Sequence, residues 1–139
     1  MQKHRKVGHG MKSIKEKNKQ AQYKSRRTRN GTINDRMYSA KTRAKDRGLD
    51  YNLTLSYLIS IWEEQEGRCK LSGAELGYTG TGWSAASLDR IDPDIGYIEG
   101  NVQWVCWRIN DAKSNMTNQD FINMCTAIAA TFIETIKDD

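Results

Sequence analysis

The chain has 139 residues, a length typical of one domain, and its 28% charged and 9% aromatic residues fit a folded protein better than a disordered one. Its apolar stretches are shorter than the ~20 residues of a membrane span, and no apolar signal segment follows the basic N-terminus. We therefore expect a cytoplasmic protein without membrane contact.

The charge is divided unevenly along the chain. Residues 1–50 carry 16 Lys or Arg against 4 acidic residues, whereas residues 51–139 carry 6 against 13. Each cation that neutralises a phosphate releases condensed counterions, so a basic arm on an acidic domain is typical of a nucleic-acid binder. A charged tail that only aids solubility is the alternative.

Residues 1–30 lack apolar periodicity, and we expect a basic arm that is mobile or loosely helical. A helix is predicted to begin at Thr32 or Asn34 and to end at Gly48 as its C-cap. Its basic side chains are predicted DNA contacts: Arg36, Lys41, Arg43, Lys45 and Arg47.

Thr54 is the predicted N-cap of a second helix, which ends near Gly67. Residues 31–67 are thus interpreted as a helical segment that contacts DNA. A short strand is expected at residues 68–71 and an extended segment at about residues 85–91.

After the turn at Pro93, residues 102–105 are predicted to be a brief strand or the start of a helix that runs to about Lys113. A capping pattern at Thr117 opens a last helix with a predicted buried stripe. The residues of this stripe are Phe121, Met124, Cys125, Ile128, Phe132, Ile133 and Ile136.

Asp89 and Asn110 offer two oxygen ligands about twenty residues apart. Mg²⁺ prefers a few oxygen ligands together with water and substrate phosphate, so one carboxylate and one amide suffice for a phosphodiester site. A turn residue and an ordinary helix residue are the alternative reading.

A longer pattern surrounds these two residues. It comprises Ala86-Ser87-Leu88-Asp89-Arg90-Ile91-Asp92, Gly96-Tyr97, Gly100-Asn101-Val102-Gln103-Trp104-Val105, Asn110 and Lys113. Trp62, Gln65, residues 67–73, Phe121 and Cys125 extend it. Over roughly residues 40–128 the chain resembles the HNH (ββα-metal, His-Me finger) endonucleases, in a phage-type variant.

The resemblance implies roles at matching positions. Asp89 and Asn110 match the two metal ligands, and Asn101 matches the residue that braces the loop and orients the general base. Arg90 stands where the family has its general-base His. A guanidinium with a pKa above about 12 does not accept a proton at neutral pH, so Arg90 is interpreted as a clamp on the phosphate.

The general base must then be another group. Tyr97 is the leading candidate because it lies in the same turn, Asp92 is the second, and water activated by the metal or the phosphate is the third. A packed turn aromatic is an equal reading of Tyr97. The chain has two histidines, His4 and His9, and both lie in the arm.

Many members of the family hold a zinc ion on two Cys-x-x-Cys pairs. Here the matching positions read Cys69-Lys70-Leu71-Ser72 and Cys106-Trp107-Arg108-Ile109, so each pair retains one cysteine. Two thiolates are too few for a four-ligand site, and we expect no structural zinc and no disulfide. Trp62, Leu71, Trp104, Val105, Ile109 and the last helix are expected to supply the core instead.

Lys113 follows Asn110 by one helical turn and is predicted to project from the same face toward DNA, with a surface lysine as the alternative. Arg108 is a further predicted contact, or a surface residue.

The predicted fold is α+β and mostly helical, with a ββα-metal (HNH) core at residues 68–139, flanking helices and the basic arm. The predicted function is a DNA endonuclease that uses Mg²⁺ or Mn²⁺ on double-stranded DNA, with a homodimer as one option. A catalytically weakened DNA-binding or regulatory protein is the alternative, and a basic RNA-binding protein is a third interpretation.

Overall fold

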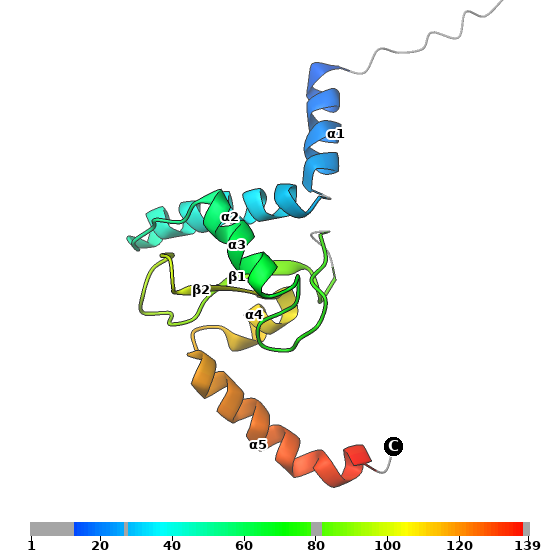
Figure 1. The fold of residues 1–139 in the computed structure, drawn as a ribbon, viewed down its shortest axis with the longest axis vertical. Helices are drawn as coiled ribbons and strands as arrows, with labels where there is room; N and C mark the ends of the chain where they lie inside the picture. Colours follow the sequence, from blue (N-terminus) through cyan, green and yellow to red (C-terminus); the bar gives the residue numbers. More distant parts are fainter. Residues whose placement is uncertain (1–12, 27, 79–81, 138–139) are drawn as a thin grey trace, which may run out of the picture.

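The computed structural model describes residues 13–26, 28–78 and 82–137. It contains five helices and one two-stranded antiparallel sheet in these ranges (Figure 1). In chain order the elements are α1 (Ile14–Arg26), α2 (Arg29–Arg47), α3 (Leu55–Glu64), β1 (Ala86–Arg90), β2 (Val102–Cys106), α4 (Trp107–Lys113) and α5 (Asn118–Lys137). The predicted mostly helical α+β fold is confirmed.

Local capping signals set the ends of α2 and α3. The Thr28 side chain accepts a hydrogen bond from Gly31 N at the start of α2, and Thr54 does the same for Tyr57 N at the start of α3. Gly48 ends α2 in the left-handed conformation, with φ of 66°. The predicted caps at Thr54 and Gly48 are therefore confirmed, while α2 begins several residues before the predicted start.

Strands β1 and β2 pair antiparallel and lead directly into α4, which makes a ββα unit. Leu88 pairs with Trp104, and Asp89 pairs with Gln103. All five residues of β2 are buried, because the strand is in contact with α3, α4 and β1. The segment at residues 102–105 is thus a strand, and the helix starts immediately after it.

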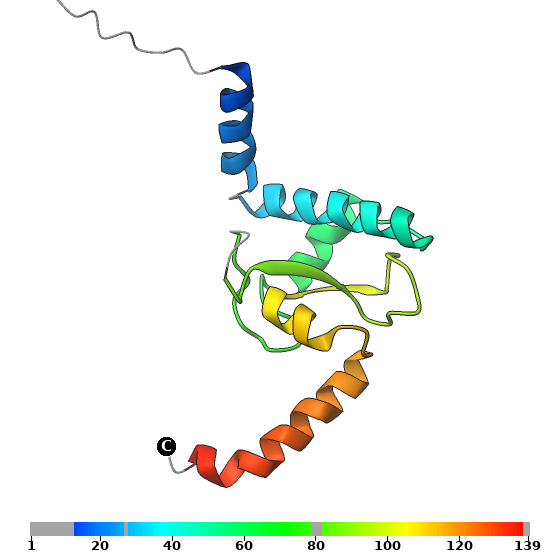
Figure 2. The same cartoon turned by 180° about the vertical axis from the view of Figure 1, so that it is seen from behind.

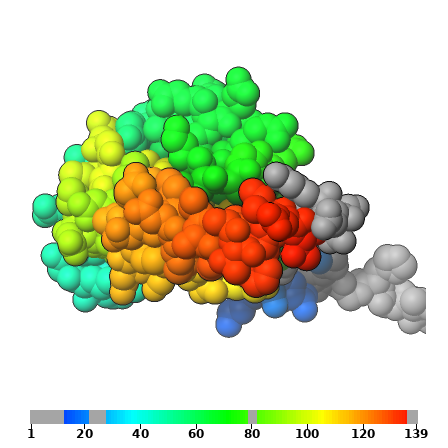
Figure 3. Space-filling view, turned by 90° about the horizontal axis from the view of Figure 1, so that it is seen from below, coloured from blue at the N-terminus to red at the C-terminus, as the bar shows by residue number. Residues whose placement is uncertain are grey.

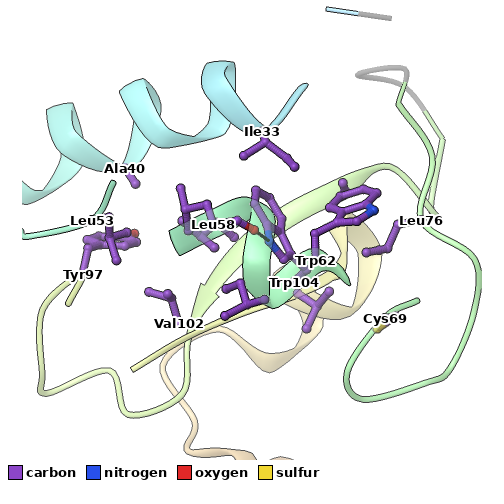
Figure 4. Close-up of a cluster of buried hydrophobic side chains, with 14 of the residues drawn as sticks. Ile33, Ala40, Leu53, Leu58, Trp62, Cys69, Leu76, Tyr97, Val102 and Trp104 are labelled. Atoms are coloured by element: carbon purple, nitrogen blue, oxygen red, sulfur yellow. Dashed lines mark hydrogen bonds between the residues drawn. The ribbon is translucent and has the colours of Figure 1, made fainter. Parts of the chain in front are cut away.

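One hydrophobic cluster joins the two predicted segments, residues 31–67 and residues 68–139 (Figure 4). Trp62 and Trp104 meet edge to face with ring centroids 5.4 Å apart. The Trp104 indole donates to Leu58 O over 3.0 Å, so the buried indole nitrogen is satisfied. Leu71 and Ile109, expected in the core, pack against the cluster as partly buried residues.

The turn after β1 is fixed against the segment that follows α2. Tyr97 N donates to Asp50 O over 2.9 Å, and Asn52 N donates to Tyr97 O over 3.1 Å. A Cβ added at Gly96 would clash with Asp50 O and lie 2.8 Å from Asp50 N. Glycine is therefore required at position 96 for this close approach.

The strand predicted at residues 68–71 is wrong. The segment folds back on itself, with Cys69 N donating to Ala74 O and Gly73 N donating to Cys69 O. Arg68 retains a single bridge to Glu75. This short segment of alternating basic and apolar residues is part of a turn because Gly73, with φ of 72°, reverses the chain just after it.

Part of the predicted arm is helical. Residues 14–26 form α1, in which Glu16 and Ser13 exchange hydrogen bonds in a capping box. In the two opposite views α1 extends from the start of α2 away from the sheet (Figures 1 and 2). The first twelve residues of the arm, with His4 and His9, lie outside the described residues.

The predicted buried stripe of the last helix is wrong. Phe121 is buried, but Ile128, Phe132 and Ile133 are 56%, 55% and 48% exposed. Met124 and Cys125 are exposed too, and the Ile136 side chain lies outside the described part. Helix α5 leaves the core after its first turn and forms a ridge (Figures 2 and 3). Within the described ranges, no helix has the length and apolar character to span a membrane.

Candidate functional site

A groove of about 540 Å³ lies between α2 and the ββα unit. It collects residues from α2, β1, the turn after β1, and α4. Its lining residues are Arg36, Ser39, Arg43, Arg47, Ser87, Leu88, Asp89, Arg90, Pro93, Tyr97, Trp107, Asn110, Asp111, Ser114 and Asn115. Four arginines against two aspartates make the groove basic, although the segment that carries β1 and α4 is acidic overall.

Asp89 is 5% exposed and lies at the base of this groove. Its Oδ2 accepts hydrogen bonds from Gln103 Nε2 over 2.9 Å and from Lys113 Nζ over 2.8 Å. Its Oδ1 receives no hydrogen bond from a described residue. Since every buried side-chain N or O atom of the described residues has a partner, Oδ1 is the oxygen that solvent reaches.

Lys113 is placed differently from its prediction. It does not project beside Asn110 toward DNA, and it is not a surface lysine, because its side chain is fully buried. The ammonium pairs with Asp89 and donates to Arg90 O over 2.7 Å. A buried ammonium needs a charged partner and a full set of acceptors, and the strand carrying Asp89 supplies both.

Asn110 projects from α4 into the groove and completes the oxygen pair. Its Nδ2 donates to Ser87 Oγ over 2.6 Å, which fixes the amide, and its Oδ1 has no partner among the described residues. One carboxylate oxygen and one amide oxygen thus remain for a ligand. This donor set fits a hard divalent cation that keeps water and takes further oxygens from a phosphate. Among the residues described, no group of three or more His, Cys, Asp or Glu converges on a metal position.

Tyr97 lies between two arginines. Its hydroxyl oxygen accepts a hydrogen bond from Arg43 Nε over 3.0 Å. The guanidinium carbons of Arg43 and Arg90 lie 5.5 Å and 5.3 Å from the centroid of its ring. Tyr97 is 4% exposed and lines the groove, so it is both a packed turn aromatic and a wall of the site.

Arg90 is held by the turn that follows it. Its NH1 donates to Pro93 O over 2.6 Å and also approaches Ile95 O at 3.4 Å. Its NH2 and Nε make no hydrogen bond to a described residue, so one side of the planar fork remains for a ligand in the groove. A half-buried guanidinium with free donors is suited to a phosphate oxygen.

Asn101 braces the same turn. Its side chain is 6% exposed, accepts from Asp92 N over 3.0 Å, and donates to Asp92 O and Gly96 O over 3.0 and 2.9 Å. Asp92 accepts from Asp94 N, as in an Asx turn, and is not part of the groove lining. The second candidate for the general base is therefore turned into the loop.

The predicted DNA contacts on α2 divide into two sets. Arg36, Arg43 and Arg47 line the groove, with Arg36 also donating to Ala86 O over 2.8 Å. Lys41 and Lys45 are exposed but do not line it. Arg108 is exposed and does not line the groove, but its guanidinium carbon lies 5.8 Å from the ring centroid of Trp107, which does.

The cysteine pair, Cys69 and Cys106, lies in the core and outside the groove lining. Ser72 N donates to Cys69 Sγ over 3.4 Å, and Ser72 Oγ lies 4.0 Å from Cys106 Sγ. Burial by itself raises the pKa of the Cys69 thiol, but hydrogen bonds from Ser72 and from nearby backbone outweigh burial and hold this pKa below its usual value. Burial, and after it the nearby Cys69 thiol, raises the pKa of Cys106. All three cysteines are free thiols, and the expected absence of zinc stays a prediction.

No role is predicted from the sequence for Gln103 and Ser87, although both belong to the pattern around Asp89 and Asn110, and Asn118 is not connected with the site there. Gln103 and Asn118 form a reciprocal amide pair, with N to O distances of 2.8 and 3.0 Å. The signal for Gln103 is a polar residue within an apolar strand, opposite Asp89 in the register. No comparable signal identifies Asn118, which is far from Asp89 in sequence.

Comparison with known proteins gives two findings. No family model matches the chain. An uncharacterized 29.0 kDa protein in the dda-modA intergenic region of Enterobacteria phage T4 is 32% identical over 90 residues, which cover 65% of this chain and 35% of that protein. The chain thus spans about a third of the length of this relative.

The second finding concerns the fold. The structure of PacI, a rare-cutting HNH restriction endonuclease described for its DNA perturbation, aligns with a TM-score of 0.55 and 17% identity. The alignment covers 74% of this chain and 80% of that one. The chain therefore has an HNH-like fold.

Proposed function

We propose that the protein is a DNA endonuclease that nicks or cuts double-stranded DNA by phosphodiester hydrolysis with one divalent ion, Mg²⁺ or Mn²⁺. The observation that carries this proposal is the groove that brings Asp89 and Asn110 together with four arginines. The HNH-like fold supports a nuclease. The phage relative supports a phage-encoded protein, and for such a protein we propose the host cytoplasm as the place of action.

Asp89 Oδ1 and Asn110 Oδ1 are the two oxygens that would hold the ion. When bound there, the ion would polarise the scissile phosphate and stabilise the negative charge on the departing oxygen. Gln103 and Lys113 fix the Asp89 carboxylate from behind, and Ser87 fixes the Asn110 amide. The ligands are thus held before DNA arrives, which lowers the reorganisation that binding requires.

The arginines of the groove would bind the phosphates on either side of the scissile bond. Arg90 is held by Pro93 O, and Arg43 by the Tyr97 hydroxyl, so neither side chain has to be ordered when DNA binds. The remaining donors of each guanidinium can give charge-assisted hydrogen bonds to a phosphate. Arg47 adds further positive charge to the groove.

Tyr97 is the proposed proton acceptor for the attacking water. Arg43 Nε donates to the Tyr97 hydroxyl oxygen over 3.0 Å, and Tyr97 lines the groove, so this oxygen is held in place at the site. Asn101 would orient Tyr97 indirectly, because it holds the turn at Gly96, next to Tyr97. Water activated by the metal or by the phosphate is the alternative.

Plasmid cleavage tests the proposal. We expect conversion of supercoiled plasmid to nicked or linear DNA that requires Mg²⁺ or Mn²⁺ and that is abolished in Asn110→Ala and Asp89→Asn. Asp89→Ala is a poorer choice, because it removes both the charge and the acceptor oxygen that the buried Lys113 ammonium uses, and breaking such a pair costs about 3–5 kcal/mol of stability. Asp89→Asn keeps an acceptor oxygen for Lys113.

Asp94→Asn is the matched control, since Asp94 is exposed and outside the groove lining. It should cut as the wild type does. If wild type, Asn110→Ala and Asp89→Asn show the same background, the nuclease proposal is wrong.

A binding or regulatory protein with weakened catalysis is the second candidate. Arg90 in the position of the base and Lys113 paired with Asp89 favour it, because both place positive charge where a nuclease needs a base or a metal ion. Under this alternative, Asn110→Ala would bind duplex DNA as the wild type does, and neither would cut it.

We further propose a homodimer through α5. The exposed residues Ile128, Phe132 and Ile133 need a cover, and α5 has no Lys or Arg before Lys137, so nucleic acid is a poor partner for it. A helix of 20 residues with an apolar face, about 30 Å long, is complementary to a second copy of itself around a two-fold axis.

A further inference from the structure

The ammonium of Lys113 makes all its polar contacts inside the protein. Nζ lies 2.8 Å from Asp89 Oδ2, 2.7 Å from Arg90 O and 3.5 Å from Ile91 O, so its donors all point to β1 and the residue after it. The side chain is fully buried. The positive charge therefore stays beside Asp89 whether or not DNA is present.

Asp89 Oδ2 likewise makes its hydrogen bonds inside the protein. Besides Lys113 it accepts from Gln103 Nε2, and Gln103 is in turn held by the reciprocal amide pair with Asn118. The carboxylate is thus fixed by groups from β2, α4 and the start of α5. Oδ1 is the oxygen left for a cation, and the carboxylate is presented as a ligand with one oxygen.

The site offers a cation no net negative charge before a ligand binds. The Asp89 and Lys113 pair is formally neutral, Asn110 is neutral, and four arginines line the same groove against one further acid, Asp111. The affinity of oxygen sites for divalent cations rises with the number of charged ligands. A DNA phosphate in the groove would supply the negative charge that the protein's own ligands do not provide for a divalent cation.

We propose, on the premise of the proposed nuclease function, that Lys113 makes metal binding depend on DNA. Lys113 is a positioning residue that holds Oδ2, presents Oδ1 and cancels the carboxylate charge, so that a divalent cation binds strongly once a phosphate is in the groove. By linkage, the cation strengthens DNA binding by the same factor. The free protein would then carry little metal.

The test measures Mn²⁺ binding by electron paramagnetic resonance of the free ion, without reference to cleavage. Full-length wild type and Lys113→Met are titrated alone and with a short phosphorothioate duplex, which keeps the backbone charge. For wild type we expect Mn²⁺ affinity to rise at least tenfold when duplex is present. For Lys113→Met we expect affinity without duplex to rise several-fold and the effect of the duplex to shrink.

If the role of Lys113 were merely structural, Lys113→Met would have a lower Mn²⁺ affinity without duplex than the wild type, because a disordered Asp89 would bind Mn²⁺ more weakly. Lys113→Arg keeps the charge and should keep weak DNA-free binding. Lys70→Met removes an exposed lysine of the same charge and should behave as the wild type does. Equal or weaker Mn²⁺ binding by a folded Lys113→Met, judged by circular dichroism, overturns the inference.

If Lys113→Met does not fold, the wild type still decides, because Mn²⁺ affinity that duplex leaves unchanged contradicts the inference. Failure of the nuclease proposal looks different. No Mn²⁺ binding with or without duplex contradicts both, whereas tight binding without DNA together with metal-dependent cleavage contradicts the inference alone.

Discussion

Arg43 donates from Nε to the hydroxyl oxygen of Tyr97 over 3.0 Å, so a side chain of α2 reaches the turn that carries the site. We predict that Tyr97→Phe lowers the rate of DNA cleavage by about 10²- to 10⁴-fold, the range that general bases contribute. The contacts of both guanidiniums with the ring remain, so DNA affinity should fall far less than the cleavage rate, by the loss of the hydrogen bond that orders Arg43. Single-turnover cleavage and a separate binding titration measure the two effects.

Tyr38→Phe is the control, because Tyr38 is a 60% exposed tyrosine on the same helix as Arg43. Arg90→His places an imidazole at the position of the missing base, and in the Tyr97→Phe background it should restore part of the rate. Cleavage by Tyr97→Phe at the wild-type rate would exclude the phenol as the base.

The two sets of basic residues on α2 predict unequal effects on DNA binding. Arg47→Gln removes a groove arginine and should weaken duplex binding by about tenfold, the effect of removing one charge-assisted hydrogen bond of about 1.4 kcal/mol. Lys45→Gln removes the same charge from the part of α2 outside the groove and should weaken binding less. Fluorescence anisotropy at one fixed salt concentration measures both, and equal effects would place DNA elsewhere.

The basic arm is expected to supply affinity rather than chemistry. Deletion of residues 1–26 stops before the Thr28 cap, so α2 keeps its N-terminal hydrogen bond to Gly31. Each phosphate that the shortened protein no longer neutralises reduces the slope of log K against log salt by about 0.9, so the slope should flatten. Binding titrations from about 50 to 200 mM salt measure it, and an unchanged slope would mean that the arm does not touch DNA.

Asn101 satisfies three backbone groups of the turn at once. Asn101→Ala leaves these groups without their partner, and at about 1–3 kcal/mol for each buried group the total loss of unfolding free energy should be at least about 2 kcal/mol. Urea unfolding measures it. Asn52→Ala, which removes a single exposed bond to Glu99 N, is the control and should cost clearly less.

The dimer through α5 makes a prediction about molecular mass in solution. Ile128→Asp places a charge in the apolar ridge and should convert a dimer to a monomer in light scattering, since a buried unpaired charge is costly. Thr126→Asp adds the same charge two residues earlier, about 200° around the helix, and should leave the dimer intact. A monomeric wild type at tens of micromolar would contradict the dimer.

The sequence predicts the ends of elements well where a local cap sets them, as at Thr54 and Gly48. It also brings Asp89, Asn110 and Tyr97 to one site, because all three belong to one ββα pattern. Lys113 shows the limit of such reasoning. Spacing of i to i+3 places Lys113 near Asn110 on the helix. The direction of its long side chain, however, is set by the charge of Asp89 on β1, and the spacing along α4 gives no information about that partner.

The prediction of a buried stripe on the last helix is wrong for a related reason. Apolar residues at helical spacing show that α5 has a face that avoids water, but they do not say whether the cover comes from the same chain. At residues 68–71 the alternation of basic and apolar residues is compatible with a strand or a turn, and the structure has a turn because Gly73 reverses the chain.

The close packing of Gly96 on Asp50 determines when the groove forms during synthesis. The arginines of α2 and the turn after β1 form one groove only after the backbone at residue 50 has met the backbone at residues 96 and 97. A chain still leaving the ribosome before Asn110 is made has no complete groove, and neither has a chain in which this packing has opened. Under the proposed nuclease function, cleavage requires the finished fold, and nucleic acids near an immature chain would be spared.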